Sequence, residues 1–431
     1  MALSEHIARV AEPLAPIDDP DFARAFDRYA DRKVVMLGEA SHGTHEFYAA
    51  RAAITRRFVE QHGFTIIAVE ADWPDAAVLD RYVRHLSPPA GAEPPFQRFP
   101  TWMWRNRVVA QMLQDLRRLN EGREPAKMAG FYGLDMYNMS GSIGAVLGYL
   151  DEHDPQAAAL ARERYGCLMP WQDEPADYGR TAITRGFGWC EEPVLQQCRD
   201  LLDRALANSD GEDLFGAAMN ARLVSSAERY YRVMYYGGAE SWNLRDAHMA
   251  ETLEHLLDHG GPDAKAIVWA HNSHIGDARA TDMGRARGEH NIGQLVRERW
   301  GSAAALIGFG THTGTVTAAS DWDAERETKH VLPSRADSHE RPCHESGIPR
   351  FLLDLGPDAD PDLLDQLREP RLERFIGVIY RPETERWSHY SAAVLAEQFD
   401  GWVWFDETSA LEPLEPYEPH DGMADTWPFG V

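Results

Sequence analysis

Several signatures of familiar chemistry are missing from this chain of 431 residues. No GxSxG nucleophile elbow occurs, and Ser41 in ASHG has no glycine at the position that such an elbow requires. No GxxxxGK[ST] phosphate loop occurs, and no GxGxxG motif follows a predicted strand. A serine nucleophile and nucleotide-dependent chemistry therefore have no support in the sequence.

Cysteine and long apolar runs are also scarce. The N-terminus has no basic region of the kind that opens a signal peptide, and no run approaches the roughly 18–20 apolar residues of a membrane span. The cysteines include no CxxC pair, so we expect free thiols in a reducing compartment. These features predict a soluble, cytoplasmic protein that does not bind membranes. The four cysteines are Cys167, Cys190, Cys198 and Cys343.

Positive charge is in deficit. The chain carries 43 Lys and Arg against 69 Asp and Glu, a formal net charge of −26 that is spread along the sequence. Nucleic acids and anionic membranes are bound mainly through Lys and Arg. The composition therefore argues against both as partners.

Apolar residues make up 44% of the chain, enough for a substantial core. Short apolar runs rich in β-branched residues alternate with segments of helical periodicity. This alternation predicts an α/β fold with a mainly parallel central sheet flanked by helices. The predicted strands cover 34–37, 65–69, 128–134, 266–269, 303–308, 315–318, 351–355, 375–380 and 401–405.

The middle of the chain differs from the rest. From about residue 140 to 257 helical periodicity is nearly continuous, and no segment has the pattern of a strand. We therefore expect three parts: residues 1–139 as a helical lead-in and the first part of the α/β core, 140–257 as a helical insertion or lid over the active edge, and 258–431 as the second part of the core with a Pro-rich, acidic tail.

Polar side chains gather around the first predicted βαβ unit. Glu39 and His42 follow the strand at 34–37, a helix is expected from about 46 to 62, and Glu70 comes at the end of the next strand. In open α/β sheets ligands bind at the carboxyl ends of parallel strands. The unit therefore delivers two carboxylates and a histidine to the edge where a site is expected.

A second cluster, HNSH, follows the strand at 266–269. Its His271 and His274 are spaced i, i+3, which places them on one side of a helix or tight turn. Two chemistries fit the combined set of residues. In one, a histidine oriented by a carboxylate activates water, while another histidine and an arginine stabilise an oxyanion or the leaving alcohol. In the other, the histidines and carboxylates bind a divalent metal ion, although no close-spaced zinc signature is present.

Each cluster also has a purely structural interpretation. Glu39 and His42 could cap the following helix, Glu70 could be a structural residue at a strand end, and the HNSH segment could be a solvated turn. The joint placement of the clusters at strand ends is what favours function. We expect His45 to be structural, and Asp135 at the end of another strand fits a pocket wall and a helix cap equally well.

The motifs resemble those of the erythromycin esterase family. The resemblance is carried by GEASHG, by Arg51 nine residues after His42, by VEADWPD and by WAHNSH, and it extends over most of the chain. ESWNLRDAHM, DWDAERE, PRFLLDL and YRPETERWSHY are also similar to recurrent segments of that family. The last of these resembles its chromosomal branch, whose members often carry the name succinoglycan biosynthesis protein, rather than the dedicated resistance enzymes.

The resemblance implies a carboxylic ester hydrolase that opens a macrolide or other macrocyclic lactone without a covalent intermediate. By motif position, His42 is the implied general base and Glu39 its partner, and Arg51, Glu70, His271 and His274 complete the implied catalytic set. The family is described as metal-independent, so neither a metal nor another cofactor is expected. Its fold is similar to that of a haem-binding lipoprotein group, which keeps a ligand-binding protein, for haem or for a metal, as the alternative.

Overall fold

The computed structural model describes residues 1–88, 94–171, 178, 180–181, 190–207, 211–235 and 238–414. Within them the chain forms two compact units. The first comprises residues 1–67, 96–129 and 260–431, and the second comprises 68–95 and 130–259. The expected helical segment 140–257 falls inside the second unit, whereas the expected first part of the core, 1–139, is shared between the two. That the helical segment acts as a lid stays a prediction.

The predicted fold class, α/β with a mainly parallel sheet, is confirmed. In the first unit the strands follow the order β1-β8-β11-β6-β2-β5. β7 pairs with the C-terminal part of β6, residues 314–319. The pairs β11/β6, β6/β2 and β2/β5 are parallel, whereas β11/β8, β8/β1 and β6/β7 are antiparallel. The strands are β1 (Glu12–Pro13), β2 (Val34–Leu37), β5 (Ala266–Trp269), β6 (Ala304–Ala319), β7 (Arg326–Val331), β8 (Arg350–Asp354) and β11 (Gly401–Thr408), and a separate two-stranded sheet pairs β9 (Arg371–Arg374) with β10 (Tyr390–Ala393).

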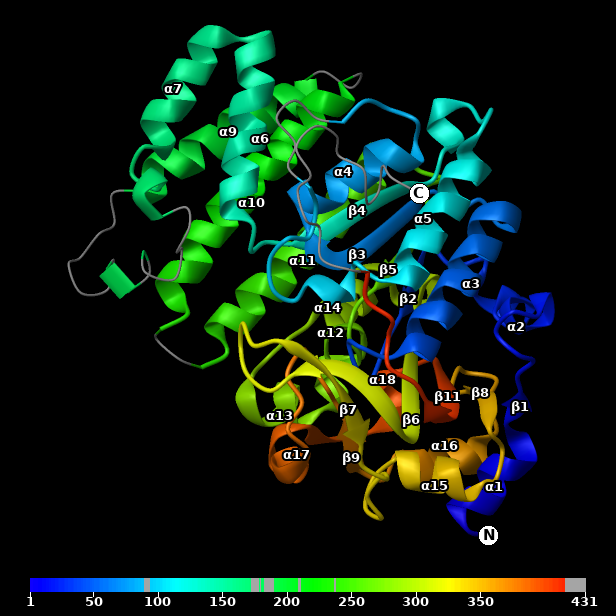
Figure 1. The fold of residues 1–431 in the computed structure, drawn as a ribbon. Helices are drawn as coiled ribbons and strands as arrows, with labels where there is room; N and C mark the ends of the chain where they lie inside the picture. The colour runs from blue at the N-terminus through cyan, green and yellow to red at the C-terminus, as the bar shows by residue number, and fades with distance from the viewer. Residues whose placement is uncertain are drawn as a thin grey trace. The chain divides into compact units, whose positions relative to one another are not determined.

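Helices pack around this sheet, among them α3 and α5, which run side by side (Figure 1). α3 buries Phe47, Ile54 and Phe58 on one face, and it ends before Gly63, whose φ of 71° suits the turn into the next strand. The first-unit helices are α1 (Leu3–Val10), α2 (Pro20–Arg24), α3 (His45–Gln61), α5 (Arg107–Asn120), α12 (Asn272–Ile275), α13 (Asp282–Arg287), α14 (Ile292–Trp300), α15 (Glu340–Glu345), α16 (Pro361–Leu367), α17 (Glu385–Ser388) and α18 (Leu395–Gln398).

In the second unit two neighbouring strands are accompanied by helices. β3 (Ile66–Asp72) begins at the end of the first unit and is adjacent to β4 (Gly130–Asp135). As expected, the described part of segment 140–257 contains helices and no strand. The second-unit helices are α4 (Trp73–Val83), α6 (Met139–His153), α7 (Pro155–Tyr165), α9 (Glu191–Ala207), α10 (Glu212–Val233) and α11 (Glu240–His259).

Two strand predictions are wrong. The expected strands at 303–308 and 315–318 are one strand, β6, whose Gly308 and Gly310 leave room for the ring of Trp402. The expected strand at 375–380 is irregular, because its backbone bonds alternate between two partners. Ile376 bonds the backbone of Ala40 and His42, whereas the residues on either side of Ile379 bond that of Ala319.

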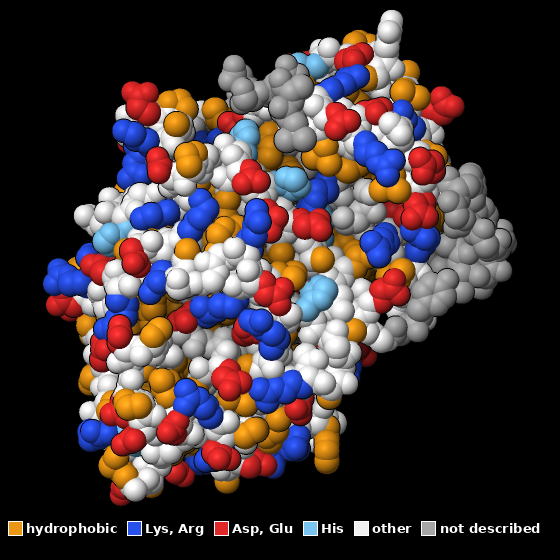
Figure 2. Space-filling model, turned by 180° about the vertical axis from the view of Figure 1, so that it is seen from behind, with side chains coloured by type: hydrophobic (Ala, Val, Ile, Leu, Met, Phe, Trp, Pro, Cys, Tyr) orange, Lys and Arg blue, Asp and Glu red, His pale blue; other side chains and the backbone are white. Residues whose placement is uncertain are grey.

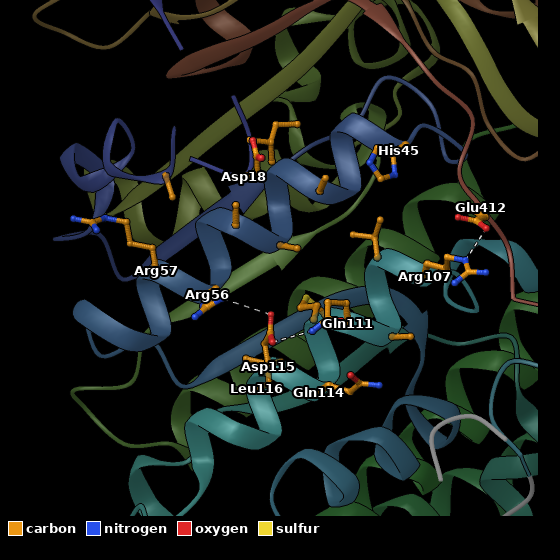
Figure 3. Close-up of a pocket in the computed structure, with 18 of the residues that line it drawn as sticks. Asp18, His45, Arg56, Arg57, Arg107, Gln111, Gln114, Asp115, Leu116 and Glu412 are labelled. Atoms are coloured by element: carbon orange, nitrogen blue, oxygen red, sulfur yellow. Dashed lines mark hydrogen bonds and ion pairs between the residues drawn. The ribbon is translucent and has the colours of Figure 1, made fainter. Parts of the chain in front are cut away.

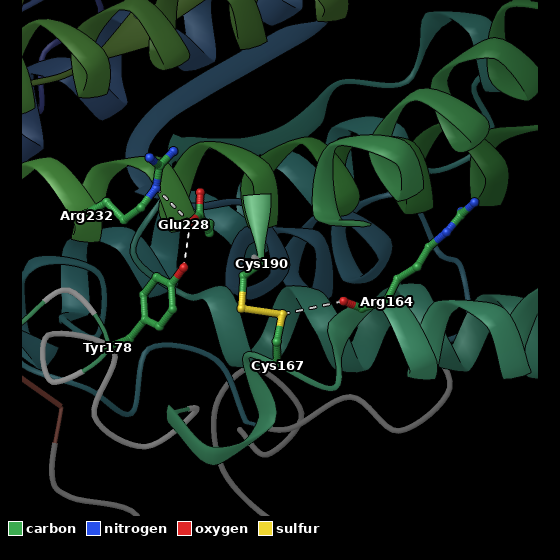
Figure 4. Close-up of a disulfide and its surroundings, with 6 residues drawn as sticks. All are labelled: Arg164, Cys167, Tyr178, Cys190, Glu228 and Arg232. Atoms are coloured by element: carbon green, nitrogen blue, oxygen red, sulfur yellow. Dashed lines mark hydrogen bonds and ion pairs between the residues drawn. A yellow bond between two sulfur atoms is a disulfide. The ribbon is translucent and has the colours of Figure 1, made fainter. Parts of the chain in front are cut away.

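The expectation of four free thiols is also wrong. Cys167 and Cys190 form a disulfide in the second unit, with Cα atoms 5.8 Å apart, while Cys198 and Cys343 are free and buried (Figure 4). A spacing of 23 residues gives no hint of the pairing, because a disulfide depends on how close the two residues lie in the folded unit and not on their separation in the sequence.

The surface charge and the described helices agree with what the composition predicts. On the face seen in Figure 2, acidic and basic side chains are interspersed rather than gathered in one basic patch. Among the described helices, none combines the length and the apolar character needed to cross a membrane. The absence of nucleic-acid partners and the cytoplasmic location stay predictions.

Candidate active site

The loop after β2 carries the first predicted site residues and is tightly anchored. The backbone N–H of His42 donates to the carbonyl of Ile376 (3.2 Å), and the carbonyl of Gly43 accepts from Thr317 of β6 (3.0 Å). A Cβ on Gly43 would lie 1.8 Å from the carbonyl oxygen of Thr317, so only glycine allows β6 to approach this closely. The second glycine of GEASHG thus fixes where His42 lies.

His42, Glu39 and Arg51 form a buried chain of charge-assisted contacts. The Nδ1 of His42 lies 2.9 Å from Oε1 of Glu39, and the other carboxylate oxygen accepts from Nη2 of Arg51 (2.6 Å). Arg51 is fully buried on α3, with its guanidinium over the rings of Tyr48 and Trp269. Removing either partner of such a buried pair leaves an uncompensated charge. The arrangement orients the imidazole of His42 through a fixed carboxylate.

The second histidine loop meets the first. His271 follows β5, and its ring centroid lies 4.8 Å from that of His42, with the ring planes tilted by 46°. The backbone N–H of Asn272 donates to the carbonyl of Glu39 (2.9 Å), which ties the two loops together. Phe375, from the irregular segment 375–380, packs against His271 with ring centroids 6.0 Å apart. The two loops are therefore neighbours in space although they are far apart in the sequence.

Hydrogen bonds assign different tautomers to the two histidines. The Nδ1 of His271 accepts from the backbone N–H of Ser273 (3.3 Å) and lies 2.9 Å from its hydroxyl. A backbone N–H can only donate, so a neutral His271 carries its proton on Nε2. The Nδ1 of His42 faces a carboxylate and carries the proton there, which leaves a lone pair on Nε2. One ring thus offers a base and the other a hydrogen-bond donor.

The remaining two predicted residues have other surroundings. His274 is buried on the short helix α12, three residues beyond His271. Glu70 belongs to the second unit, inside β3 rather than just after it, and it accepts from Nη2 of Arg245 (2.8 Å). The structure brings together Glu39, His42, Arg51 and His271; it places His274 on the helix that follows His271 and gives Glu70 partners of its own.

The sequence does not predict that Arg245 joins Glu70 to Asp135. Arg245, from α11, also pairs bidentately with Asp135 of β4, through Nε–Oδ1 (2.9 Å) and Nη2–Oδ2 (2.6 Å). Burial disfavours the charge of Arg245, but Asp135, Tyr137 and Glu70 outweigh this effect and hold its pKa well above the usual value. The signals were present in the sequence, since Asp135 ends a strand and Arg245 lies in the segment ESWNLRDAHM, but nothing local links them.

A prominent surface cavity lies elsewhere in the first unit. It has a volume of about 1080 Å³ and lies along α2, α3 and α5, with Ala49, Ala52 and Ala53 contributing small side chains to its wall (Figure 3). His45, which the sequence analysis treats as structural, lines it, and none of the six predicted site residues does. The cavity is therefore not the site assembled by the two histidine loops.

No metal-binding arrangement is found among the described residues. A metal ion needs several ligands that converge on one point, and in this part of the chain no group of three or more His, Cys, Asp and Glu side chains is placed to hold one. Metal independence itself stays a prediction.

Fold and site together define the class: an α/β protein with paired histidines and a buried carboxylate beyond its parallel strands, suited to acid–base chemistry. The chain belongs to the erythromycin esterase family, whose model matches residues 59–408. Glu39, His42 and Arg51 precede the matched range, so their assignment depends on the motif and the geometry. Membership of this family supports hydrolysis as the activity.

Individual relatives are distant. YbfO of Bacillus subtilis, named provisionally as a hydrolase, is 21% identical over 87% of this chain and 83% of its own length. Erythromycin esterase type I of Escherichia coli is 26% identical over 59% of this chain and 66% of its own length. A crystal structure described as a succinoglycan biosynthesis protein has a TM-score of 0.78 and 22% identity, covering 95% of this chain and 97% of that one. At this identity the structural likeness establishes the fold alone.

Proposed function

We propose that this chain is a cofactor-independent carboxylic ester hydrolase that opens a macrolide or another macrocyclic lactone with water. The observation that carries the proposal is the closeness of the two imidazoles, whose ring centroids lie 4.8 Å apart, and the opposite kinds of partner at their Nδ1 atoms, a carboxylate for His42 and a backbone N–H for His271. Hydrolysis by activated water needs one group that takes a proton and another that binds the developing oxyanion. Family membership supports the same reaction class.

In this mechanism the Nε2 of His42 removes a proton from water as the water oxygen attacks the ester carbonyl. The negative charge of the tetrahedral intermediate develops on the former carbonyl oxygen, to which His271 donates from Nε2. When the C–O bond of the ester breaks, the protonated His42 returns its proton to the alkoxide oxygen. The products are a carboxylic acid and an alcohol, and in a lactone both remain on one opened chain.

Glu39 holds the proton of His42 on Nδ1 and stabilises the imidazolium that forms during the reaction. Arg51 has a different role from the one expected. It is fully buried and bound to Glu39, so it orients that carboxylate rather than contacting the oxyanion. His274 is proposed to complete the site by binding the substrate or the leaving group, while a role for Glu70, which belongs to the second unit, stays a prediction.

The function is tested by mass spectrometry of the purified protein with a panel of macrolides and other lactones. The expected product is heavier by one water. In H2¹⁸O the heavy oxygen should enter the new carboxylate during the first turnover, because water attacks directly. If the wild-type protein opens no lactone, the proposed substrate class is wrong; if denaturation traps an acylated protein, the proposal of direct attack is wrong.

The same preparation tests the binding alternative and metal independence. Elemental analysis and an absorbance spectrum would reveal a metal or haem at near-stoichiometric amounts, and this result would favour a binding protein or a metal-dependent hydrolase. Persistence of activity after dialysis against a chelator is the outcome expected here. A cytoplasmic location is proposed from the sequence, but the disulfide weakens one of its arguments, because such bonds persist mainly in oxidising compartments.

A further inference from the structure

Asn272, which follows His271 and begins α12, joins three neighbouring strands. It is fully buried and lies just beyond the end of β5. Its side chain pairs with the backbone of Phe309 in β6: Nδ2 donates to the carbonyl (2.8 Å), and Oδ1 accepts from the N–H (3.3 Å). Its own backbone N–H donates to the carbonyl of Glu39, beyond β2. One residue therefore connects β6 with the ends of β2 and β5.

The loop after β2 is shaped to receive this amide. A Cβ on Gly38 would lie 2.2 Å from Oδ1 of Asn272, a distance at which one of the two atoms must move. Glycine at this position thus leaves the space that the amide fills. The first glycine of GEASHG and the asparagine of HNSH are complementary parts of one contact.

The backbone of Phe309 fixes which way the amide of Asn272 faces, and a buried carboxyl group is a third partner. The Nδ2 of Asn272 also donates to Oε1 of Glu373 (3.3 Å), a residue of β9 that is fully buried. Burial, reinforced by the nearby carboxylate of Glu340, raises the pKa of Glu373 well above its usual value. With the amide reversed, its NH2 group would face the N–H of Phe309 and its oxygen would face a carbonyl. Only one orientation satisfies all three partners.

We propose that Asn272 is a positioning residue that fixes the separation of His42 and His271 by locking the loops after β2 and β5 onto β6. The expected effect on kcat rests on the proposed hydrolase function, whereas the expected effect on the positions of the two histidine rings does not. Displacement of a reacting group by about 1 Å can cost on the order of 10²-fold in rate. Asn272 touches neither water nor ester in this scheme and acts only through the two histidines.

The test compares Asn272→Ala with Asn120→Ala. Asn120 is equally buried and makes the same paired contact, to the backbone N–H and carbonyl of Ala129, both at 2.8 Å. Both variants lose a paired contact with the backbone of one residue, but only Asn272→Ala is expected to lower kcat, by about 10–100-fold, with a smaller change in KM. The second readout is ¹⁵N NMR of the histidine side chains, in which the signals of His42 and His271 should shift in Asn272→Ala alone.

Gly38→Ala supplies a second, independent variant. Its added methyl group should displace the amide and reproduce the loss in kcat. In the Asn272→Ala background the amide is gone and the nearest remaining atoms, in Ile275 and Ile307, lie 3.2 Å from the added Cβ, so Gly38→Ala should then cost less than it does in the wild-type protein. Additive losses in the two variants would overturn the proposal, as would unchanged NMR signals in Asn272→Ala. If the wild-type protein hydrolyses no ester, the function fails, but the NMR comparison still decides whether Asn272 positions the two rings.

Discussion

His42 and His271 lie with their ring centroids 4.8 Å apart, and each is bonded at Nδ1 to a partner of the opposite kind. His42 meets the carboxylate of Glu39, an acceptor, whereas His271 meets the backbone N–H of Ser273, a donor. The two imidazoles therefore differ in what they offer at Nε2. Because each Nδ1 partner comes from the histidine's own loop, the difference is built into the fold.

This difference predicts unequal rescue by glutamine, whose amide nitrogen donates a hydrogen bond but cannot act as a base. His42→Ala should lower kcat/KM by about 10²–10⁴-fold, and His42→Gln should be no better. His271→Gln should instead recover part of the activity lost in His271→Ala. Rates measured from lactone opening on the same panel decide the matter. Equal rescue at both positions would contradict the assigned tautomers.

The buried pair of Glu39 and Arg51 makes a prediction about stability. Glu39→Gln and Arg51→Met should each destabilise the protein, by about 3–5 kcal/mol if the remaining charge stays buried. The double variant should lose less than the sum, since it leaves no charge without a partner. Urea unfolding of all four proteins measures the coupling. Strict additivity would mean that the two side chains do not depend on each other.

A similar argument applies to Arg245 in the second unit. Arg245→Ala should destabilise by about 3–5 kcal/mol, because it removes the positive charge that pairs with the buried carboxylates of Glu70 and Asp135. The matched control is Arg162→Ala on α7, whose pair with Asp151 is about half exposed and should therefore contribute little to stability. Thermal and urea unfolding compare the two variants. Equal losses of unfolding free energy in the two variants would show that the pairs of Arg245 contribute no more than an exposed ion pair.

Sequence patterns locate the elements whose interactions are local. They predict β2 and β5 to the residue, because each is a continuous apolar run stopped by a polar or glycine-containing loop. They divide β6 in two, because glycines interrupt its apolar pattern at the place where the ring of Trp402 fills the space. The segment 375–380 has the composition of a strand, but its partners alternate between two distant segments, and composition cannot show this.

The site follows the same division. The closeness of Glu39, His42 and His271 is predictable, because all three follow buried parallel strands, whose carboxyl ends meet at one edge of the sheet. The burial of Arg51 against Tyr48 and the contact of Asn272 with Phe309 depend on how elements pack, so their roles emerge only in the folded structure. Arg245 lies 110 residues from Asp135 and 175 from Glu70, which puts its contacts beyond any local pattern.

The disulfide predicts a specific count of thiols. In denaturant, without reduction, two of the four cysteines should react with a thiol reagent, and all four should react after reduction. In the native protein even the free ones should react slowly, because burial raises the pKa of Cys198 to about 11 and that of Cys343 well above its usual range. Four reactive thiols before reduction would contradict the disulfide and would mean that Cys167 and Cys190 are free, as the sequence predicts.

The last prediction concerns the dependence of stability on pH, with Glu373 as the titrating group. Burial and Glu340 raise its pKa well above the usual value, so the folded protein keeps this proton to a higher pH than the unfolded chain does. The contribution of this group to stability is fully present below its unfolded pKa and is lost as the pH rises through its folded pKa. Glu373→Gln keeps the shape of the side chain and removes the titration.

The Glu373→Gln variant should therefore gain stability relative to wild type as the pH rises from the usual value of 4.5 toward the raised pKa of the folded state. The gain should grow by up to about 1.4 kcal/mol for each step of one in pH, because the unfolded wild-type chain binds one proton fewer than the folded one. Urea unfolding at several pH values measures this gain. The difference between the two proteins should become independent of pH at about pH 3, where both chains are neutral at this position. A constant difference across the whole range would mean that Glu373 titrates normally.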